Sequence, residues 1–163
     1  MRLAIVPGSF DPMTLGHLDL IRKVARKYDQ VVVAVMQNAE KTYRFSPEER
    51  LKIAEETVLD LENVRVIFDG GMLIDLYDRL GACAVCKGWR NETDLAYEQS
   101  MAEWNRAHNP RFYTDLIEAS PAYADYSSTR VRLAMEQNSD LSGMVHPRAL
   151  AFCVNKKKGT DEK

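Results

Sequence analysis

The sequence predicts an α/β protein built on a Rossmann-like, parallel five-stranded sheet with helices on both faces. Short runs of β-branched and other apolar residues alternate along the chain with segments of helical periodicity. Strands that alternate with helices form βαβ units, and such units build a mostly parallel sheet. The chain has 163 residues and shows no internal repeat, low-complexity tract or linker, so one domain with a sizeable core is expected.

Five short runs, rich in valine, isoleucine and other apolar residues, are the expected strands. They are Leu3–Val6, Val31–Met36, Val64–Phe68, Ala82–Cys86 and Phe112–Ile117. Near-continuous apolar runs of this kind are typical of strands that are buried on both faces of a sheet.

Helical patterns occupy the segments between and after these strands. In the first of them Leu18, Ile21 and Val24 fall on one face. Ser46 to Glu49 form a strong helix start, with an N-cap serine, a proline at the first position and a glutamate at the third. The expected helices are Leu15–Arg26, Pro47–Leu61, Met72–Leu80, Asp94–Ala107, Ser128–Glu136 and Pro147–Asn155.

Composition and charge limit the classes of function. The net charge is −2, so no overall basic field draws the chain to nucleic acid or to a membrane surface. No apolar stretch approaches the roughly 20 residues that span a bilayer, and the N-terminus has no signal-peptide layout. We therefore expect a cytoplasmic protein with one domain over residues 1–155 and a charged, mobile tail over residues 156–163.

Cys83 and Cys86 form a C-x-x-C pair, which could be a redox pair or half of a zinc site. On the expected strand Ala82–Cys86, however, a separation of three residues places the two side chains on opposite faces. No second Cys/His pair lies at zinc spacing. We interpret both cysteines as structural, and the odd total of three cysteines indicates reduced thiols.

The segment from Gly8 to His17 carries the strongest chemical signal. It reads Gly-Ser-Phe-Asp-Pro-Met-Thr-Leu-Gly-His and follows the first expected strand directly, with a helix beginning near Thr14. Free backbone N–H groups and the positive dipole end at a helix start favour phosphate. Gly16 would let a ligand approach the backbone closely, and His17 places a ring nitrogen beside the expected anion. We interpret the segment as an anion-binding site, and the alternative is a turn with a purely structural role.

Residues 8–12 together with residues 14–17 resemble the T/H-x-G-H signature of the nucleotidyltransferase superfamily. Residues 126–132 resemble the I-S-S-S-x-x-R segment of the phosphopantetheine adenylyltransferases, and the intervening motif residues from Lys41 to Asn105 fall in that family's order. The resemblance runs from the first strand to about Arg132. It implies an enzyme that transfers an adenylyl group reversibly from ATP to 4′-phosphopantetheine, giving dephospho-CoA and pyrophosphate in coenzyme A biosynthesis.

The resemblance also implies a role for each matching residue. His17 would contact the ATP phosphates and stabilise the transition state, and Ser9 would donate to the incoming phosphate. Lys41 and Lys87 would flank the phosphates and complete the catalytic set. The residues implied to bind ATP are Ser9, Phe10, His17, Gly88, Trp89, Arg90, Glu98, Tyr123, Ala124, Asp125, Tyr126, Ser127, Ser128 and Thr129. Those implied to bind the acceptor are Ser9, Lys41, Leu73, Lys87 and Asn105.

The family further implies Mg²⁺ that accompanies ATP, a homohexamer, and coenzyme A as a possible feedback inhibitor. No residue is assigned as a metal ligand, because no paired-carboxylate motif stands out; Asp11 is the carboxylate to examine. The substrate phosphate is itself a competent nucleophile, so the reaction needs donors and cations rather than a general base.

Several of these residues also have a structural interpretation. Lys41 could be a solvated loop residue, and residues 127–129 could only cap the helix that follows them. Glu98 and Tyr97 could belong to an ordinary helix face. Met101 and Trp104, at helical spacing, are expected in the core rather than against a ligand.

The chain departs from the family pattern at several motif positions. Lys87 stands where an arginine is usual and loses the planar fork that grips phosphate. Leu15 replaces the usual asparagine, and Tyr126 and Thr129 replace isoleucine and serine. These changes bear on the acceptor more than on the reaction. The alternatives are an adenylyltransferase for another phosphorylated acceptor, such as nicotinate mononucleotide, and a non-catalytic nucleotide-binding protein.

Overall fold

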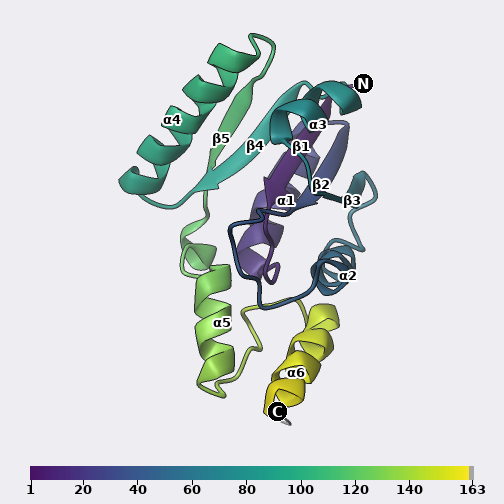
Figure 1. The fold of residues 1–163 in the computed structure, drawn as a ribbon, viewed down its shortest axis with the longest axis vertical. Coiled ribbons are helices and arrows are strands. Elements are labelled where there is room, and N and C mark those ends of the chain that lie inside the picture. Colours follow the sequence, from purple (N-terminus) through teal and green to yellow (C-terminus); the bar gives the residue numbers. More distant parts are fainter. Residues whose placement is uncertain (162–163) are drawn as a thin grey trace.

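The protein is built on a parallel sheet of five strands, which follow one another in the order β3-β2-β1-β4-β5 (Figure 1). The computed structural model describes residues 1–161, with side chains to residue 156. The strands are β1 (Leu3–Gly8), β2 (Gln30–Met36), β3 (Val64–Asp69), β4 (Ala84–Trp89) and β5 (Thr114–Glu118). The expected fold class and number of strands are confirmed.

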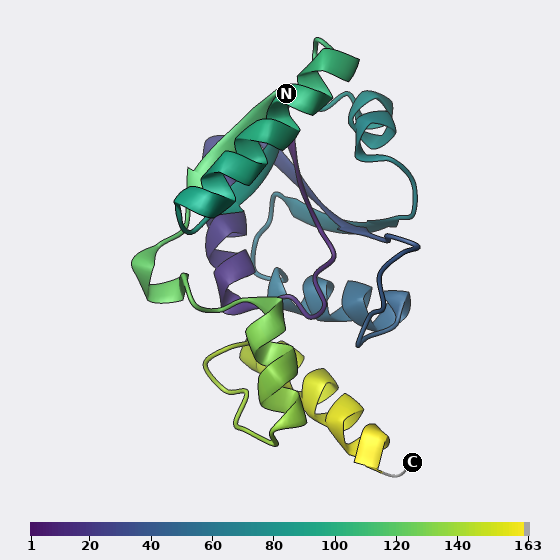
Figure 2. The ribbon, with the colours of Figure 1, turned by 60° about the vertical axis from the view of Figure 1, so that its left-hand side comes forward.

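The helices between and after these strands also follow the expected order. They are α1 (Leu15–Lys27), α2 (Pro47–Thr57), α3 (Leu73–Leu80), α4 (Glu92–His108), α5 (Ser128–Glu136) and α6 (Pro147–Asp161), with a short 3-10 turn η1 (Pro121–Tyr123) before α5. In Figure 2, α5 and α6 lie below the sheet on the side away from α3 and α4. Among residues 1–161, no helix is both long and apolar enough to cross a membrane.

Alternate residues of the central strands pack against helices on both faces of the sheet. Val6 of β1 and Val33 of β2 belong to the larger apolar cluster, which includes side chains of α1, α2, α5 and α6. Ile5 and Ala34, their chain neighbours, belong to a second cluster with Leu76 of α3. Because successive side chains of a strand point to opposite faces, the two clusters cover the two faces, as the sequence predicts.

The fourth strand begins and ends later than the apolar run suggests. We expected it over Ala82–Cys86, but it starts at Ala84 and continues to Trp89, because β5 pairs with it as far as Trp89↔Glu118. Cys83 therefore lies outside the strand and is exposed, whereas Cys86 is buried. Burial raises the pKa of the Cys86 thiol to about 12, which makes it a poor thiolate nucleophile or ligand. The structural interpretation of the C-x-x-C pair is favoured.

Two helix ends and one strand start also differ from expectation. α2 stops at Thr57 instead of Leu61, because Leu61 N–H turns back to the Val58 carbonyl at 2.9 Å. β5 starts at Thr114 instead of Phe112, whose ring packs on Tyr77. α6 runs to Asp161, past the expected end at Asn155. The tail expected to be mobile thus begins within a helix, and residues 162–163 lie outside the described part of the chain.

Candidate active site

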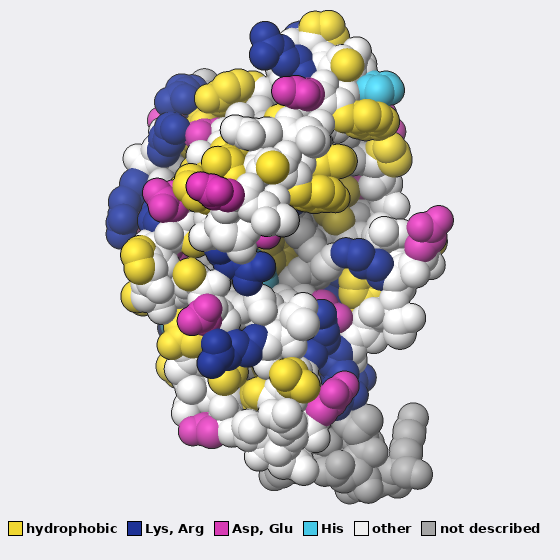
Figure 3. Space-filling view, turned by 90° about the vertical axis from the view of Figure 1, so that its left-hand side faces the viewer, with side chains coloured by type: hydrophobic (Ala, Val, Ile, Leu, Met, Phe, Trp, Pro, Cys, Tyr) yellow, Lys and Arg dark blue, Asp and Glu magenta, His cyan; other side chains and the backbone are white. Residues whose placement is uncertain are grey.

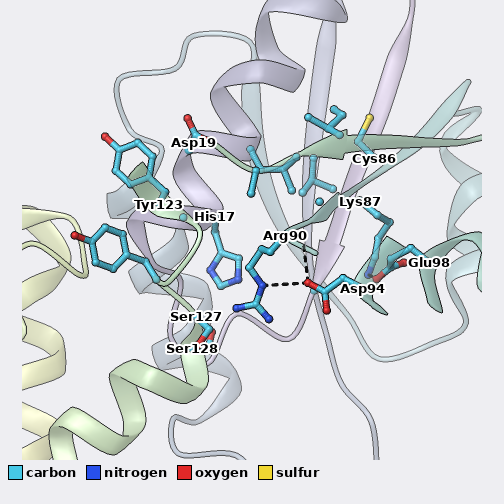
Figure 4. A pocket seen from close by; sticks show the side chains of 18 of the residues that line it. His17, Asp19, Cys86, Lys87, Arg90, Asp94, Glu98, Tyr123, Ser127 and Ser128 are labelled. Carbon is cyan, nitrogen blue, oxygen red and sulfur yellow. Dashed lines mark hydrogen bonds and ion pairs between the residues drawn. The ribbon is translucent and has the colours of Figure 1, made fainter. Parts of the chain in front are cut away.

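A pocket of about 700 Å³ lies where the strand order reverses. The chain leaves β1 toward β2 and β3 on one side, and β4 and β5 extend the sheet on the other. The pocket is lined by the carboxyl ends of β1 and β4, the first turns of α1 and α4, and residues 117–119, 123 and 126–129 (Figure 4). Ligands of open α/β sheets bind at such reversal points, and the volume is typical of a small-molecule site.

The loop after β1 is held in a compact shape at the edge of the pocket. Phe10 has φ 47° in the left-handed region, and its ring lies over Gly8, where a Cβ would come within 2.9 Å. Arg50, which is fully buried on α2, donates to the Ser9 carbonyl at 2.9 Å and to the Met36 carbonyl at 3.1 Å. The ends of β1 and β2 are thereby tied together.

His17 lies in the first turn of α1 and closes a capping box with Thr14. The Thr14 hydroxyl oxygen accepts the backbone N–H groups of Gly16 and His17, and the Thr14 N–H donates to His17 Nδ1 at 2.9 Å. Since Nδ1 accepts this bond, the proton of the neutral ring is on Nε2. Burial, helped by the charges of Arg90 and Lys87, lowers the pKa of His17 to about 4. The ring is thus a neutral N–H donor at neutral pH.

Gly16 lines the pocket and also allows a close contact with a distant segment of the chain. A Cβ at this residue would come within 2.8 Å of the Tyr126 carbonyl oxygen and 3.2 Å of the Tyr123 carbonyl oxygen. The absence of a side chain therefore lets the segment before α5 approach the start of α1. The close approach of a ligand to Gly16 stays a prediction, and the structure adds a close approach by backbone from a distant part of the chain.

The end of β4 contributes two basic side chains to the pocket, each near a carboxylate of α4. Lys87 Nζ lies 3.7 Å from Glu98 Oε1, and Arg90 Nε lies 3.2 Å from Asp94 Oδ2 (Figure 4). Both cations contribute to the lowered pKa of His17, which places positive charge beside the imidazole. A phosphate there would meet one neutral donor and two cations.

The hydroxyl groups of residues 127–129 have different partners. Ser127 caps α5 by accepting the Arg130 N–H at 3.1 Å. Ser128 donates to the Pro12 carbonyl at 2.8 Å, and Thr129 accepts from Arg132 Nη2 at 3.1 Å. The segment therefore caps α5, as the structural interpretation expects, and its three hydroxyl residues also line the pocket.

The pocket gathers most of the residues that the resemblance selects. Those that line it are Ser9, Phe10, His17, Lys87, Gly88, Arg90, Glu98, Tyr123, Tyr126, Ser127, Ser128 and Thr129. Those that do not are Lys41, Leu73, Trp89, Asn105, Ala124 and Asp125. Lys41 is exposed in the loop after β2, Leu73 packs into the second apolar cluster, and Asn105 is buried on α4.

Sequence reasoning missed several lining residues, among them Asp19, Asp94, Tyr97 and Glu118. Asp94 lies one helical turn before Glu98, so helical spacing could have identified it. Asp19 accepts the Ser120 N–H at 3.4 Å and pairs with Lys23 at 3.3 Å. No sequence signal indicates that contact, because Asp19 and Ser120 are far apart in the chain.

The expectation that Met101 and Trp104 belong to the core is wrong. Trp104 is 46% exposed and Met101 39%, and the indole stacks on His108 at 3.8 Å between ring centroids. Helical spacing identifies an apolar face of α4 but not what covers it. In Figure 3, which views the side on which α4 lies, hydrophobic side chains gather over the upper part of the molecule, above a hollow flanked by basic groups.

A magnesium ion would depend on the nucleotide for most of its ligands. Among the described residues no group of three or more His, Cys, Asp and Glu side chains is placed to hold a metal. The Asp11 carboxylate is buried and accepts the N–H groups of Arg44 and Phe45, each at 2.9 Å. Mg²⁺ is commonly held by substrate phosphates, water and one or two carboxylates, and Asp94 and Glu98 of the pocket fit that pattern.

Comparison with known proteins identifies the family to which the chain belongs. The chain belongs to the cytidylyltransferase-like family, whose model matches residues 5–134, and the nucleotidyltransferase class expected from the motifs is confirmed. A crystal structure from Vibrio parahaemolyticus, assigned to the nicotinate-nucleotide adenylyltransferases, shares the fold with a TM-score of 0.73. It covers 96% of this chain and 94% of its own at 17% identity, so this likeness concerns the fold alone.

Closer relatives define the family more narrowly. A phosphopantetheine adenylyltransferase from Limosilactobacillus reuteri is 41% identical over 142 residues, which are 87% of this chain and 82% of that one. One from Bdellovibrio bacteriovorus is 38% identical over 95% of this chain and 97% of its own. One from Lachnoclostridium phytofermentans is 36% identical over 98% of both. The protein is a member of the phosphopantetheine adenylyltransferase family.

Proposed function

We propose that the protein transfers the adenylyl group of ATP to 4′-phosphopantetheine, giving dephospho-CoA and pyrophosphate. The observation that carries the proposal is the pocket at the strand-order reversal, where the Nε2–H of His17 stands beside Lys87 and Arg90. Membership of the phosphopantetheine adenylyltransferase family supplies the acceptor.

The reaction joins a phosphate oxygen of the acceptor to the α-phosphorus of ATP and breaks the bond from that phosphorus to the bridging oxygen of the leaving pyrophosphate. No general base is required, because the attacking oxygen is already anionic. The chain must align two phosphates and stabilise charge as it moves to the leaving group. His17 donates a neutral hydrogen bond to the transferring phosphoryl group, and Lys87 and Arg90 offset the repulsion between the two anions.

The two ends of ATP have different supports in the pocket. The segment from Tyr123 to Thr129 forms the wall opposite α4, and the rings of Tyr123 and Tyr126 lie 5.9 Å apart there. We assign the base to this wall, and the phosphates to the start of α1 and the end of β4. When bound, Mg²⁺ would neutralise charge on the ATP phosphates, with the pocket carboxylates Asp94 and Glu98 as candidate ligands.

The acceptor site is proposed on the side of β2. Val35 of β2 is paired with Gly8, so the loop that carries Lys41 leaves the sheet from the same edge as the pocket. We propose Lys41 and Leu73 as contacts of the acceptor on this side, and Asn105 as a contact from α4. A Lys41→Ala variant should raise the KM for the acceptor more than the KM for ATP.

The deciding experiment measures pyrophosphate release from ATP with 4′-phosphopantetheine and, separately, with nicotinate mononucleotide. Turnover with the first acceptor alone supports the proposal. Turnover with nicotinate mononucleotide alone would identify the other acceptor, and the absence of turnover with both, in a protein that binds ATP, would favour a binding protein. His17→Gln, made in parallel, shows that the turnover belongs to this site.

Three wider features belong to the same proposal. We propose a homohexamer, which is supported by the exposed apolar side chains of Tyr97, Met101 and Trp104 on α4. A cytoplasmic location is supported by three free cysteines. Inhibition by coenzyme A rests on family membership, and a loss of turnover on adding coenzyme A would support it.

A further inference from the structure

Three hydrogen bonds join the loop before α1 to the segment at the start of α5, which is more than a hundred residues away. The Thr14 hydroxyl donates to the Tyr126 carbonyl at 2.7 Å. Ser128 Oγ donates to the Pro12 carbonyl at 2.8 Å, and Arg132 Nη1 donates to the Asp11 carbonyl at 2.8 Å. Carbonyl oxygens of residues 11 and 12 thus each accept a side-chain donor from the other segment.

The hydroxyl donors of Thr14 and Ser128 are fully engaged in these bonds, because each hydroxyl carries one proton. A serine hydroxyl carries one proton, and that of Ser128 is directed at the Pro12 carbonyl. Arg132 divides its fork between the Asp11 carbonyl and the Thr129 hydroxyl oxygen. Ser127 and Thr129 use their oxygens as acceptors, so their own protons stay available for a ligand. The three consecutive hydroxyl residues therefore have two different tasks.

The same short loop is fixed from its other side. The buried Asp11 carboxylate accepts the N–H groups of Arg44 and Phe45, and Arg132 Nη1 also lies 3.8 Å from Asp11 Oδ2. The loop ends at Thr14, whose N–H donates to His17 Nδ1. The direction of that N–H depends on the peptide planes before it, which Ser128 and Arg132 hold at residues 11 and 12.

We propose that Ser128 and Arg132 are positioning residues that hold the loop of residues 11–14 and, through the Thr14 N–H, keep the proton of His17 on Nε2. With the proton on Nε2, the imidazole presents a donor to the pocket; with the proton on Nδ1, it presents an acceptor, which repels a phosphate oxygen. The effect of this tautomer on turnover rests on the proposed adenylyl transfer. The tautomer itself, and the loop that fixes it, are properties of the protein without substrate.

The test compares Ser128→Ala and Arg132→Gln with the wild-type protein in two measurements. The first is the ring ¹⁵N spectrum of His17 in the substrate-free protein at pH 7, which distinguishes the two neutral tautomers. We expect both variants to move the two ring signals toward each other as the Thr14 bond weakens. The second is steady-state turnover, in which kcat should fall roughly tenfold while the KM for ATP changes little.

Matched variants separate positioning from loss of structure. Ser128→Thr keeps the hydroxyl and should restore the wild-type ring signals. Arg130→Gln removes a guanidinium from the same helix that pairs only loosely with Asp125, at 4.0 Å, and should leave the ring signals unchanged. If Arg132→Gln does not fold, the comparison of Ser128→Ala with Ser128→Thr is sufficient to test the positioning role.

Two results would overturn the proposal. One is a wild-type His17 spectrum in a folded Ser128→Ala variant, whatever its turnover. The other is a raised KM for ATP with unchanged ring signals, which would make Ser128 and Arg132 contacts of the nucleotide. Because the spectrum is recorded without substrate, its outcome does not depend on which acceptor the enzyme uses.

Discussion

At the residue scale, the chemistry of the pocket depends most directly on His17, because its neutral ring combines a fixed proton with nearby positive charge. The Thr14 N–H occupies Nδ1, and burial, helped by the charges of Arg90 and Lys87, opposes protonation of the ring. A side chain in this state can stabilise a transferring phosphoryl group but has little use as a base.

Replacing His17 by alanine should lower kcat about a hundredfold, the loss typical of one transition-state donor, with little change in ATP affinity. The measurement is steady-state pyrophosphate release together with calorimetric ATP binding. Leu59→Ala, at an exposed site after α2, is the control and should leave kcat unchanged. Retention of turnover in His17→Ala would remove the residue from the mechanism.

The lowered pKa of His17 predicts how stability depends on pH. The folded-state pKa is about 4 against a usual 6.5, so between these values the unfolded chain binds a proton that the folded chain does not. The contribution of His17 to stability is therefore complete above pH 6.5 and is lost as the pH falls toward 4. In thermal unfolding over this range, Tm should fall more steeply for the wild type than for His17→Gln. Parallel curves would contradict the assigned pKa.

At the scale of elements, the pocket is made by contacts between segments that are remote in sequence. Arg50 illustrates this, since its buried guanidinium on α2 reaches the carbonyls of Ser9 and Met36 and the side chain of Gln37, and stacks 4.0 Å from the Tyr43 ring centroid. One side chain thus fixes both loops that leave β1 and β2.

Removing the Arg50 side chain should lower the stability of the protein. Arg50→Leu leaves several buried acceptors without a donor, and we expect the free energy of unfolding to fall by about 2–4 kcal/mol. Urea denaturation measures it. Lys52→Leu is the matched control on the same helix, where the lysine makes an exposed pair with Glu56 at 3.1 Å, and it should change stability by less than about 0.5 kcal/mol.

Gly16 offers a second test of contacts between elements. In Gly16→Ala the new Cβ would meet the Tyr126 and Tyr123 carbonyls, which are backbone and cannot rotate away. The segment before α5 must shift, so stability should fall by about 1–3 kcal/mol and the KM for ATP should rise. Gly70→Ala, whose Cβ would meet only a side-chain atom at 4.0 Å, is the control. Equal effects of the two substitutions would show that the close approach is unimportant.

Local sequence signals predicted those features of the fold that depend on residues close together in the chain. Strand and helix order, the capping box at Ser46 and the helix start at Thr14 all follow from short-range patterns. The end of β4 at Trp89 does not, because pairing with β5 extends it. The burial of Arg50 and the partner of Gly16 are also set by segments far away in the chain. Local signals also indicated an anion site at residues 8–17, whereas residues 123–129 were found through resemblance, since no local rule brings residue 17 to residue 126.

At the scale of the whole molecule, the unexplained feature is the apolar face of α4. The side chains of Tyr97, Met101 and Trp104 are exposed along it, and Tyr113, close to its end in the chain, is 56% exposed. Large exposed apolar patches generally mark contact surfaces. Because α4 also carries Glu98 and Asp94 into the pocket, a partner on this face would stabilise one wall of the active site.

If copies of the chain cover this face, the protein should assemble. A homohexamer would have a mass of about 112 kDa, six times the 18.6 kDa of the chain, and light scattering measures it. Trp104→Glu buries a charge in such an interface and should yield smaller species with lower turnover. Leu59→Glu, which places the same charge at a distant exposed leucine, should leave the mass unchanged. A hexamer that survives Trp104→Glu would place the interface elsewhere, and a wild-type mass near 18.6 kDa would contradict assembly altogether.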